Sequence, residues 1–121
     1  MMYTVPTHPK IYHILHADRL ASVLNAGGLW CDAEMQHRDG AGTTIGMNKI
    51  KQARLFERRV TCYESGFVGD YVPFYFCPRS IMLYVIAQRN NADLPYHEGQ
   101  EPIIHLQADV NTTVAWAEAQ K

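Results

Sequence analysis

The spacing of apolar residues changes along this chain, and it predicts a domain that mixes strands and helices. Short β-favouring runs over 10–14 and 102–106 predict two strands. Apolar residues at helical spacing predict helices over about 18–26, from Asn48 onward, over 81–88 and over 110–119. The chain has 121 residues and no internal repeat or linker, so we expect residues 1–121 to form a single domain.

Residues with capping or turn chemistry mark the expected ends of these elements. Asn48 and Ser80 are plausible N-caps, because their side-chain oxygens can accept a backbone N–H that the helix leaves unpaired. Gly27 and Gly28 can end the first helix in a left-handed conformation. Segment 35–44 has few apolar anchors, and we expect it to be a mobile surface loop.

An aromatic and β-branched run covers residues 66–77. Pro73 interrupts it and cannot donate to a sheet ladder, so the run predicts an irregular or edge strand. Alternation along such a segment allows two arrangements. Either Phe74 and Phe76 enter the core and Tyr75 faces outward, or the reverse holds.

Composition and charge narrow the possible functions. With 47% hydrophobic and 19% charged residues, the chain has the composition of a packed globular protein. A formal charge of −1 gives no overall attraction to phosphate, so any contact with nucleic acid must come from a local cluster. One cluster is present, and it contains Lys49, Lys51, Arg54, Arg58 and Arg59 beside Glu57. On charge alone, a solvated helix face explains it better.

Three cysteines, Cys31, Cys62 and Cys77, are far apart and form no Cys-x-x-Cys pair. This number and spacing argue against a disulfide framework and a structural zinc site, so we expect reduced thiols and no metal. A positively charged leader is not found, and no apolar run approaches the ~20 residues that span a bilayer. The expected location is therefore the cytoplasm.

General motifs for phosphate binding, zinc hydrolysis or serine catalysis are not found, so spacing alone names no reaction. Four blocks of sequence do, however, resemble successive blocks of the DarT family of DNA ADP-ribosyltransferases. They are Ile-Tyr-His-Ile at 11–14, Gly-Gly-Leu-Trp-Cys-Asp-Ala at 27–33, Ile-Lys-Gln-Ala-Arg-Leu at 50–55, and Val-Pro-Phe-Tyr-Phe-Cys-Pro-Arg-Ser-x-Met-Leu at 72–83. The resemblance extends to Pro-Ile-Ile-His-Leu at 102–106 and covers nearly the whole chain.

That resemblance implies an α+β fold with the split β-sheet and flanking helices of ADP-ribosyltransferases. It further implies binding of NAD+ and transfer of ADP-ribose to a base in single-stranded DNA, usually thymine. Family members are toxins, and each is paired with a macrodomain antitoxin that removes the modification. The reaction leaves an oxocarbenium-like ribose, which the site must orient and stabilise.

Several residues match functional positions of the family. Arg54 matches the catalytic arginine, whose donors can hold a phosphate or polarise the acceptor base. His13 matches a histidine that holds the nicotinamide side of NAD+, and Asp32 could orient NAD+ by accepting hydrogen bonds. The alternatives are a surface arginine, a structural histidine and a turn-forming aspartate.

Other residues offer stacking surfaces or lie near the expected DNA path. Tyr71, Phe74 and Tyr75, like Phe76, have flat faces that can stack on nicotinamide or an extruded base, although most such runs are core. We expect one or two of these rings to face the ligand. Lys51 of the basic cluster, with Arg79 and Met82, is expected to line the path of single-stranded DNA.

The resemblance also implies a catalytic glutamate in a later segment of the family. Glu98, Glu101 and Glu118 do not stand in a family-like context. We therefore expect an N-terminal part of the fold, incomplete at the C-terminus, with little or no transferase activity alone. A C-terminal segment, a second copy or the antitoxin would then cover its exposed surfaces. The alternatives are a non-catalytic NAD+- or nucleic-acid-binding module or toxin remnant bound by an antitoxin, and a plain structural domain.

Overall fold

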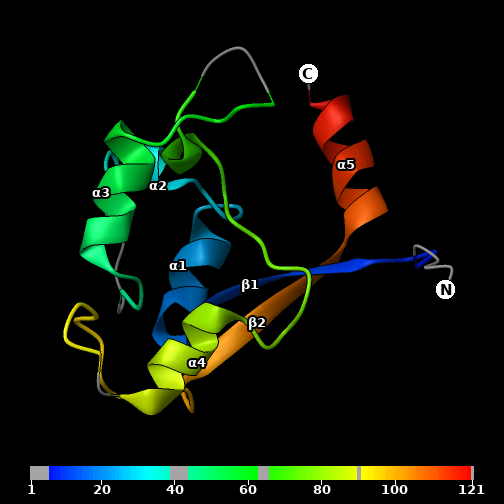
Figure 1. Ribbon diagram of the computed structural model, residues 1–121. Coiled ribbons are helices and arrows are strands. Elements are labelled where there is room, and N and C mark those ends of the chain that lie inside the picture. The colour runs from blue at the N-terminus through cyan, green and yellow to red at the C-terminus, as the bar shows by residue number, and fades with distance from the viewer. Residues whose placement is uncertain (1–5, 39–43, 63–65, 90, 121) are drawn as a thin grey trace, which may run out of the picture.

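The computed structural model describes residues 6–38, 44–62, 66–89 and 91–120, and it shows an α+β fold (Figure 1). In chain order the elements are strand β1 (Lys10–His16), 3-10 turn η1 (Ala17–Arg19), α1 (Leu20–Asn25), α2 (Asp32–Met35), α3 (Asn48–Phe56), 3-10 turn η2 (Val68–Asp70), α4 (Ile81–Gln88), β2 (Ile103–Asp109) and α5 (Val110–Ala119). Both predicted strands are present, and so are the predicted helices. The first helix is preceded by the turn η1, and the short helix α2 was not predicted.

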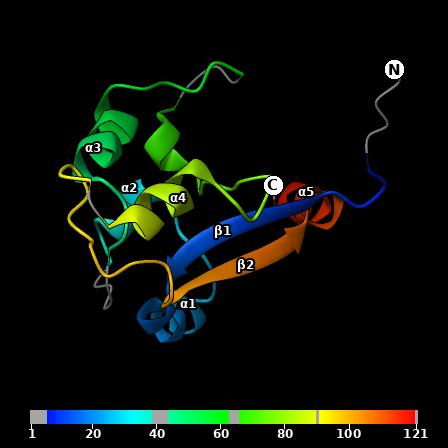
Figure 2. The same ribbon diagram turned by 60° about the horizontal axis from the view of Figure 1, so that its bottom comes forward.

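The two strands form an antiparallel pair, in which Lys10 lies opposite Asp109 and His16 opposite Ile103. A small core forms where Ile103 of β2 packs with Ile86 of α4 and with Leu94 and Tyr96 from the loop that follows α4. Helices α2 and α3 lie together at one end of the molecule, and α5 lies beyond the other end of the strand pair (Figures 1 and 2).

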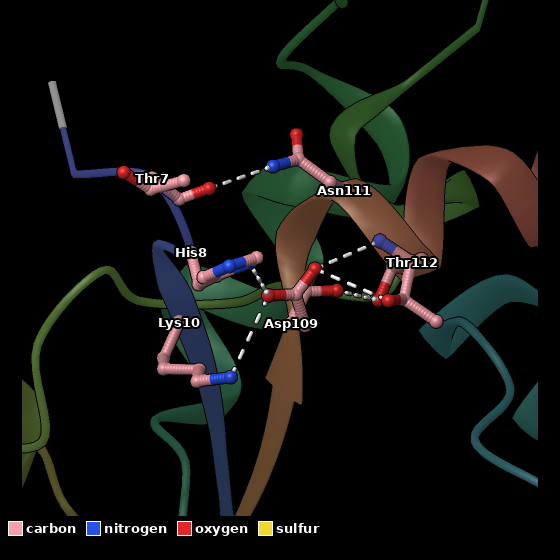
Figure 3. A network of polar contacts seen from close by, with 7 residues as sticks. Thr7, His8, Lys10, Asp109, Asn111 and Thr112 are labelled. Atoms are coloured by element: carbon pink, nitrogen blue, oxygen red, sulfur yellow. Dashed lines mark hydrogen bonds and ion pairs between the residues drawn. The ribbon is translucent and has the colours of Figure 1, made fainter.

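A polar network fixes the junction between β2 and α5 (Figure 3). Asp109 caps α5 by accepting a hydrogen bond from the backbone N–H of Thr112 at 2.9 Å. Its other carboxylate oxygen lies 3.5 Å from the Lys10 ammonium nitrogen and 3.7 Å from His8 Nδ1. The hydrogen bond from Thr112 is the main reason why the pKa of Asp109 is lowered. The start of β1 is thereby attached to α5.

The two expected helix caps had different outcomes. Ser80 caps α4 as predicted, because its hydroxyl oxygen accepts the Leu83 N–H at 3.1 Å. The prediction for Asn48 was wrong by one residue. Met47 is the N-cap of α3 and makes no side-chain cap hydrogen bond, so Asn48 is already helical.

Residues 73–78 form a strap that crosses the outer edge of β1. Tyr75 and Tyr12 exchange two backbone hydrogen bonds, each 2.8 Å long, as an isolated bridge. His13 of β1 donates from Nδ1 to the Pro73 carbonyl at 2.8 Å, and His105 of β2 donates from Nε2 to the Pro78 carbonyl at 2.9 Å. The expected irregular strand is therefore a single bridge, held at both ends by histidines.

The aromatic side chains of the strap follow neither of the two expected arrangements. Phe74 is half-buried against the ring of His13, whereas Phe76 is 76% exposed. Simple alternation fails because the strap is not a regular strand. It makes one bridge between two prolines, which cannot donate to a ladder.

Part of the predicted surface loop 35–44 lies outside the described residues, namely 39–43. Within the described ranges, no helix has the length and apolar content needed to cross a membrane. In the same ranges, no group of three or more histidine, cysteine, aspartate or glutamate side chains could hold a metal ion.

Candidate active site

A cavity of about 550 Å³ lies where β1, α1, α2 and α3 meet the strap. Its size is within the ~300–1,000 Å³ that is usual for small-molecule sites. Six of the residues proposed from the sequence line it, and they are His13, Asp32, Lys51, Arg54, Tyr75 and Met82. Residues that are far apart in the sequence are thus brought to one hollow.

Arg54 and Asp32 form an ion pair at this cavity. Arg54 is in the last turn of α3 and Asp32 begins α2, and these two helices are in contact. The Arg54 Nη1 atom lies 3.2 Å from Asp32 Oδ2, and each side chain is 20% exposed. Solvent screens a contact of this depth less than a surface pair. Asp32 is therefore in direct contact with the guanidinium at the cavity.

The hydrogen bonding of this pair is incomplete. Among the described residues, the buried Arg54 Nη2 has no hydrogen-bond partner, and the buried Asp32 Oδ2 has the ion-pair contact with Nη1 but no hydrogen bond. Folded proteins leave few buried polar atoms unsatisfied, and each costs about 1–3 kcal/mol or more when charged. Arg54 Nη2 therefore retains a donor that an oxygen atom of a ligand could accept.

His13 presents a neutral imidazole to the same cavity. Because the Pro73 carbonyl can only accept, Nδ1 carries the proton and Nε2 of the neutral ring is an acceptor. Burial is the main cause of a lowered pKa for His13, and the positive charge of Arg54 acts in the same direction. The hydrogen bond to Pro73 and the charge of Asp32 oppose this shift. The Phe74 ring, 5.7 Å away between centroids, fixes the imidazole from one side.

Tyr75 adds a phenol that stays protonated. Its backbone is fixed by the bridge to Tyr12, and its side chain is 36% exposed. Burial raises the pKa of Tyr75, while Arg54 and a hydrogen bond with Ser80 oppose the change. The hydroxyl can therefore act as a donor at neutral pH.

Positive charge dominates the cavity wall. Of the described residues that line it, Arg19, Arg38, Lys51 and Arg54 are permanently charged cations, and Asp32 is the one carboxylate. Arg38 is paired with Glu34 at 3.3 Å, and the remaining positive charge on the concave wall attracts anions. The cavity thus favours a ligand with phosphate groups and contains aromatic and imidazole groups for a flat ring.

Three proposed site residues do not line the cavity. Tyr71 is 44% exposed and its ring faces Gly66. Phe74 contacts His13 from behind, and Arg79 is exposed next to Cys77, whose Sγ donates to the Arg79 carbonyl at 3.1 Å. The roles given to Tyr71 and Arg79 therefore stay predictions without support from the cavity.

The basic cluster at 49–59 is also divided. Lys51 and Arg54 line the cavity, while the Arg59 guanidinium lies 4.6 Å from the centre of the Phe67 ring. The cluster extends past the end of α3 at Phe56, so its members do not share one helix face.

Sequence reasoning missed a second cationic group at the cavity. The Arg38 guanidinium lies 3.9 Å from the centre of the Trp30 ring, and Trp30 donates from Nε1 to the Ala26 carbonyl at 3.1 Å. Arg19 donates to Thr44 Oγ1 at 2.9 Å on another wall. Trp30 lies within the block 27–33, which was the available signal. Arg19 had none, because its position depends on the tertiary fold.

Comparison with known proteins identifies the class and then the family. The family profile described as "ssDNA thymidine ADP-ribosyltransferase, DarT" matches residues 12–120. The chain therefore belongs to the DarT family. A protein named DNA ADP-ribosyl transferase from Thermus sp. (strain 2.9) is 39% identical over 110 residues, which are 88% of this chain and 47% of that protein. The protein of the same name from Mycobacterium tuberculosis (strain H37Rv) is 31% identical over 100 residues, 79% of this chain and 40% of its own length.

Solved structures agree with this assignment. Thermus sp. 2.9 DarT in complex with ADP-ribosylated ssDNA has a TM-score of 0.82 at 36% identity, covering 97% of this chain and 53% of that one. The same Thermus protein in complex with NAD+ has a TM-score of 0.73 at 33% identity, covering 94% and 50%. The chain spans about half the length of the curated relatives it matches.

Proposed function

We propose that this chain binds NAD+ in the cavity around Arg54 and supplies the NAD+-binding part of a DNA ADP-ribosyltransferase. The observation that supports this most is the convergence of a guanidinium, a neutral imidazole and a phenol on one cation-rich hollow. Membership of the DarT family, and the Thermus relative solved with NAD+, point to the same ligand.

The residues of the cavity fit the chemistry of NAD+. Its pyrophosphate carries negative charge, which Lys51 and Arg54 on the walls can attract, while Arg38 is paired with Glu34 at 3.3 Å. The His13 Nε2 acceptor suits the carboxamide N–H of nicotinamide or a ribose hydroxyl. Tyr75 offers a ring face for stacking and a hydroxyl donor.

During transfer, the bond between nicotinamide and the ribose C1 breaks, and nicotinamide leaves with the electron pair. A nitrogen of the acceptor base bonds to C1 and passes its proton to a carboxylate or to water. We assign to Arg54 the task of holding the acceptor base or a phosphate beside this carbon, because its fork of donors stabilises developing negative charge. Asp32 is engaged by Arg54, and no glutamate is found among the described residues of the cavity wall. We therefore expect little or no transfer by these 121 residues without a further carboxylate.

We propose single-stranded DNA as the acceptor, with thymine as the modified base. This rests on the family description and on the Thermus relative solved with ADP-ribosylated ssDNA. We propose that Lys51 and Met82, which line the cavity, meet the base, and that the exposed Arg79 contacts the strand outside it. Family resemblance further suggests a cytoplasmic toxin with a macrodomain antitoxin as its partner.

A second candidate is a non-catalytic NAD+- or nucleic-acid-binding module that an antitoxin recognises. The lack of a cavity glutamate within the described residues favours it. The two candidates agree on NAD+ binding and differ in transfer, so they can be separated by adding the later half of a DarT relative in trans. Modification of a thymine-containing oligonucleotide, measured by mass spectrometry, supports the enzyme. NAD+ binding without modification supports the module.

Calorimetric titration with NAD+ tests the shared claim. We expect binding by the wild-type chain and at least tenfold weaker binding by Arg54→Ala, which corresponds to about 1.4 kcal/mol. Arg58→Ala is the matched control, because Arg58 is exposed and does not line the cavity. Its affinity should stay within about twofold of the wild type. A folded wild-type chain that binds no NAD+ would end the proposal.

A further inference from the structure

We propose that Asp32 is a positioning residue, which acts on the ligand through the Arg54 guanidinium. This inference rests on the proposed function, since it concerns how the NAD+ site orients its arginine. It differs from the expectation that Asp32 itself accepts hydrogen bonds from NAD+.

The first argument is the set of partners that the structure gives Arg54. Its Nη1 meets Asp32 Oδ2 at 3.2 Å, and its Nη2 has no hydrogen-bond partner among the described residues. A side chain with several rotatable bonds loses up to about 2 kcal/mol of rotamer entropy when it is fixed. Asp32 is the polar contact that can offset this cost within the described part of the chain, so it determines where the guanidinium points.

The second argument is electrostatic. Asp32 is the one carboxylate among the described lining residues, which include four permanent cations, and it is paired with one of them, Arg54. A carboxylate that touched the pyrophosphate directly would repel it, whereas one paired with Arg54 has its charge offset by the guanidinium. Breaking such a half-buried pair leaves the remaining charge uncompensated, which is the costly outcome.

The third argument is the construction of the pair. Asp32 is in the first turn of α2, and Arg54 is in the last turn of α3. The contact therefore joins the ends of two helices that pack together. Both side chains are only 20% exposed, so neighbouring groups restrict their alternative rotamers. The arrangement fixes the orientation of the Arg54 guanidinium, and its Nη2 atom, which has no hydrogen bond within the described residues, can donate to a second partner.

A double-mutant cycle with NAD+ as the ligand tests this role. Asp32→Asn keeps the size of the side chain and removes its charge, and we expect NAD+ binding to weaken about tenfold, a coupling of usual size between interacting groups. In an Arg54→Ala background, Asp32→Asn should change the affinity by less than about twofold. Asp93→Asn is the charge-matched control, since Asp93 is exposed and outside the cavity lining, and it should leave the affinity unchanged.

A spectroscopic readout reports on the pair without NAD+. Nitrogen-15 NMR of the arginine side chains should show slowed rotation of the Arg54 guanidinium in the wild type and in Asp93→Asn. In Asp32→Asn the Arg54 guanidinium should rotate faster, so that its NMR signals average. Thermal unfolding followed by circular dichroism checks that the variant is folded. If the Arg54 guanidinium rotates as slowly in a folded Asp32→Asn protein as in the wild type, the positioning role is overturned.

The remaining outcomes separate the claims. If the wild type binds no NAD+, the proposed function fails, and the role of Asp32 fails with it. If the wild type binds and Asp32→Asn weakens binding equally in the Arg54→Ala background, Asp32 contacts NAD+ directly and only the present inference fails. Tighter binding by Asp32→Asn would show simple repulsion and would also contradict it.

Discussion

The strap and the Asp32–Arg54 pair both join distant segments of the chain, but they differ in how completely their polar groups are hydrogen-bonded. In the strap, both backbone bonds between Tyr12 and Tyr75 are formed, and the carbonyls at each end accept from histidines. In the pair, Arg54 Nη2 and Asp32 Oδ2 are buried without hydrogen bonds among the described residues. Satisfied groups stabilise a fold, whereas unsatisfied ones indicate a place where a ligand is expected.

This comparison predicts that changes at the far end of the strap separate stability from binding. Variants that loosen the strap at Pro78, away from the site residue Tyr75, should lower the free energy of unfolding and leave NAD+ affinity nearly unchanged. Variants of the pair should weaken NAD+ binding and also lower the free energy of unfolding, because they leave a buried charge without its partner. The following changes test where that separation holds and where it breaks.

The largest effect is expected from Gly69→Ala, which should lower both the free energy of unfolding and the NAD+ affinity. Gly69 of η2 is buried against α3, and an added Cβ would lie 2.8 Å from Leu55 Cδ2 and 3.0 Å from Leu55 Cα. Because a backbone atom cannot move aside, we expect α3 to shift, with a loss of about 1–3 kcal/mol in the free energy of unfolding. Since Arg54 precedes Leu55, NAD+ affinity should fall as well.

Denaturant unfolding and NAD+ calorimetry on the same samples measure both losses. Gly46→Ala is a control for stability, because a Cβ there meets nothing within 4 Å and its φ is not in the left-handed region. Unchanged stability of Gly69→Ala would mean that η2 and α3 are not closely packed.

A smaller effect is expected from His105→Ala, which acts on the strap alone. The change removes the hydrogen bond to the Pro78 carbonyl and the edge-on contact with Tyr12, whose ring centroid lies 6.3 Å away. For an exposed side chain we expect a loss of about 0.5–1.5 kcal/mol in the free energy of unfolding. NAD+ affinity should stay within about twofold. A tenfold loss of NAD+ affinity in His105→Ala would show that this end of the strap also determines the shape of the binding site.

How much of this could be read from the sequence depended on how local the signal was. The cap at Ser80 and the helix after it were predictable, since the cap bonds to Leu83 three residues away. The four-residue helix α2 was missed because so short an element has no periodicity of its own. The orientation of Phe76 was missed because it depends on one bridge to a distant strand.

The same distinction applies to the site. His13, Arg54 and Asp32 were chosen from family resemblance, and their meeting at one cavity required the fold. That Asp32 pairs with Arg54 could not be foreseen, because the two residues lie on different helices and neither helix shows the contact in its pattern. Arg19 and the Arg38–Trp30 stack were invisible for the same reason.

The smallest effect is expected from the titration of His13, which belongs to both regions. Its pKa is lowered, chiefly by burial, below the ordinary value of 6.5. The unfolded chain therefore takes up the proton first as the pH falls. The stability contributed by neutral His13 is fully present above pH 6.5 and is lost progressively as the pH falls below that value.

Thermal unfolding of the wild type and of His13→Gln at pH 7.5 and pH 5.5 measures this contribution. Glutamine can still donate to the Pro73 carbonyl but does not titrate. The wild type should lose more stability than the variant between the two pH values. An equal loss in both proteins would show that folding does not lower the pKa of His13.

The most direct test of the account is a map of where NAD+ binds on the folded chain. In an NMR titration with NAD+, we predict that backbone amide shifts concentrate at His13, Asp32 and Arg54 around the cavity, while Tyr71 and Arg79 change little. Shifts centred on Tyr71 and Arg79, with those at the cavity unchanged, would contradict the claim that this cavity is the NAD+ site.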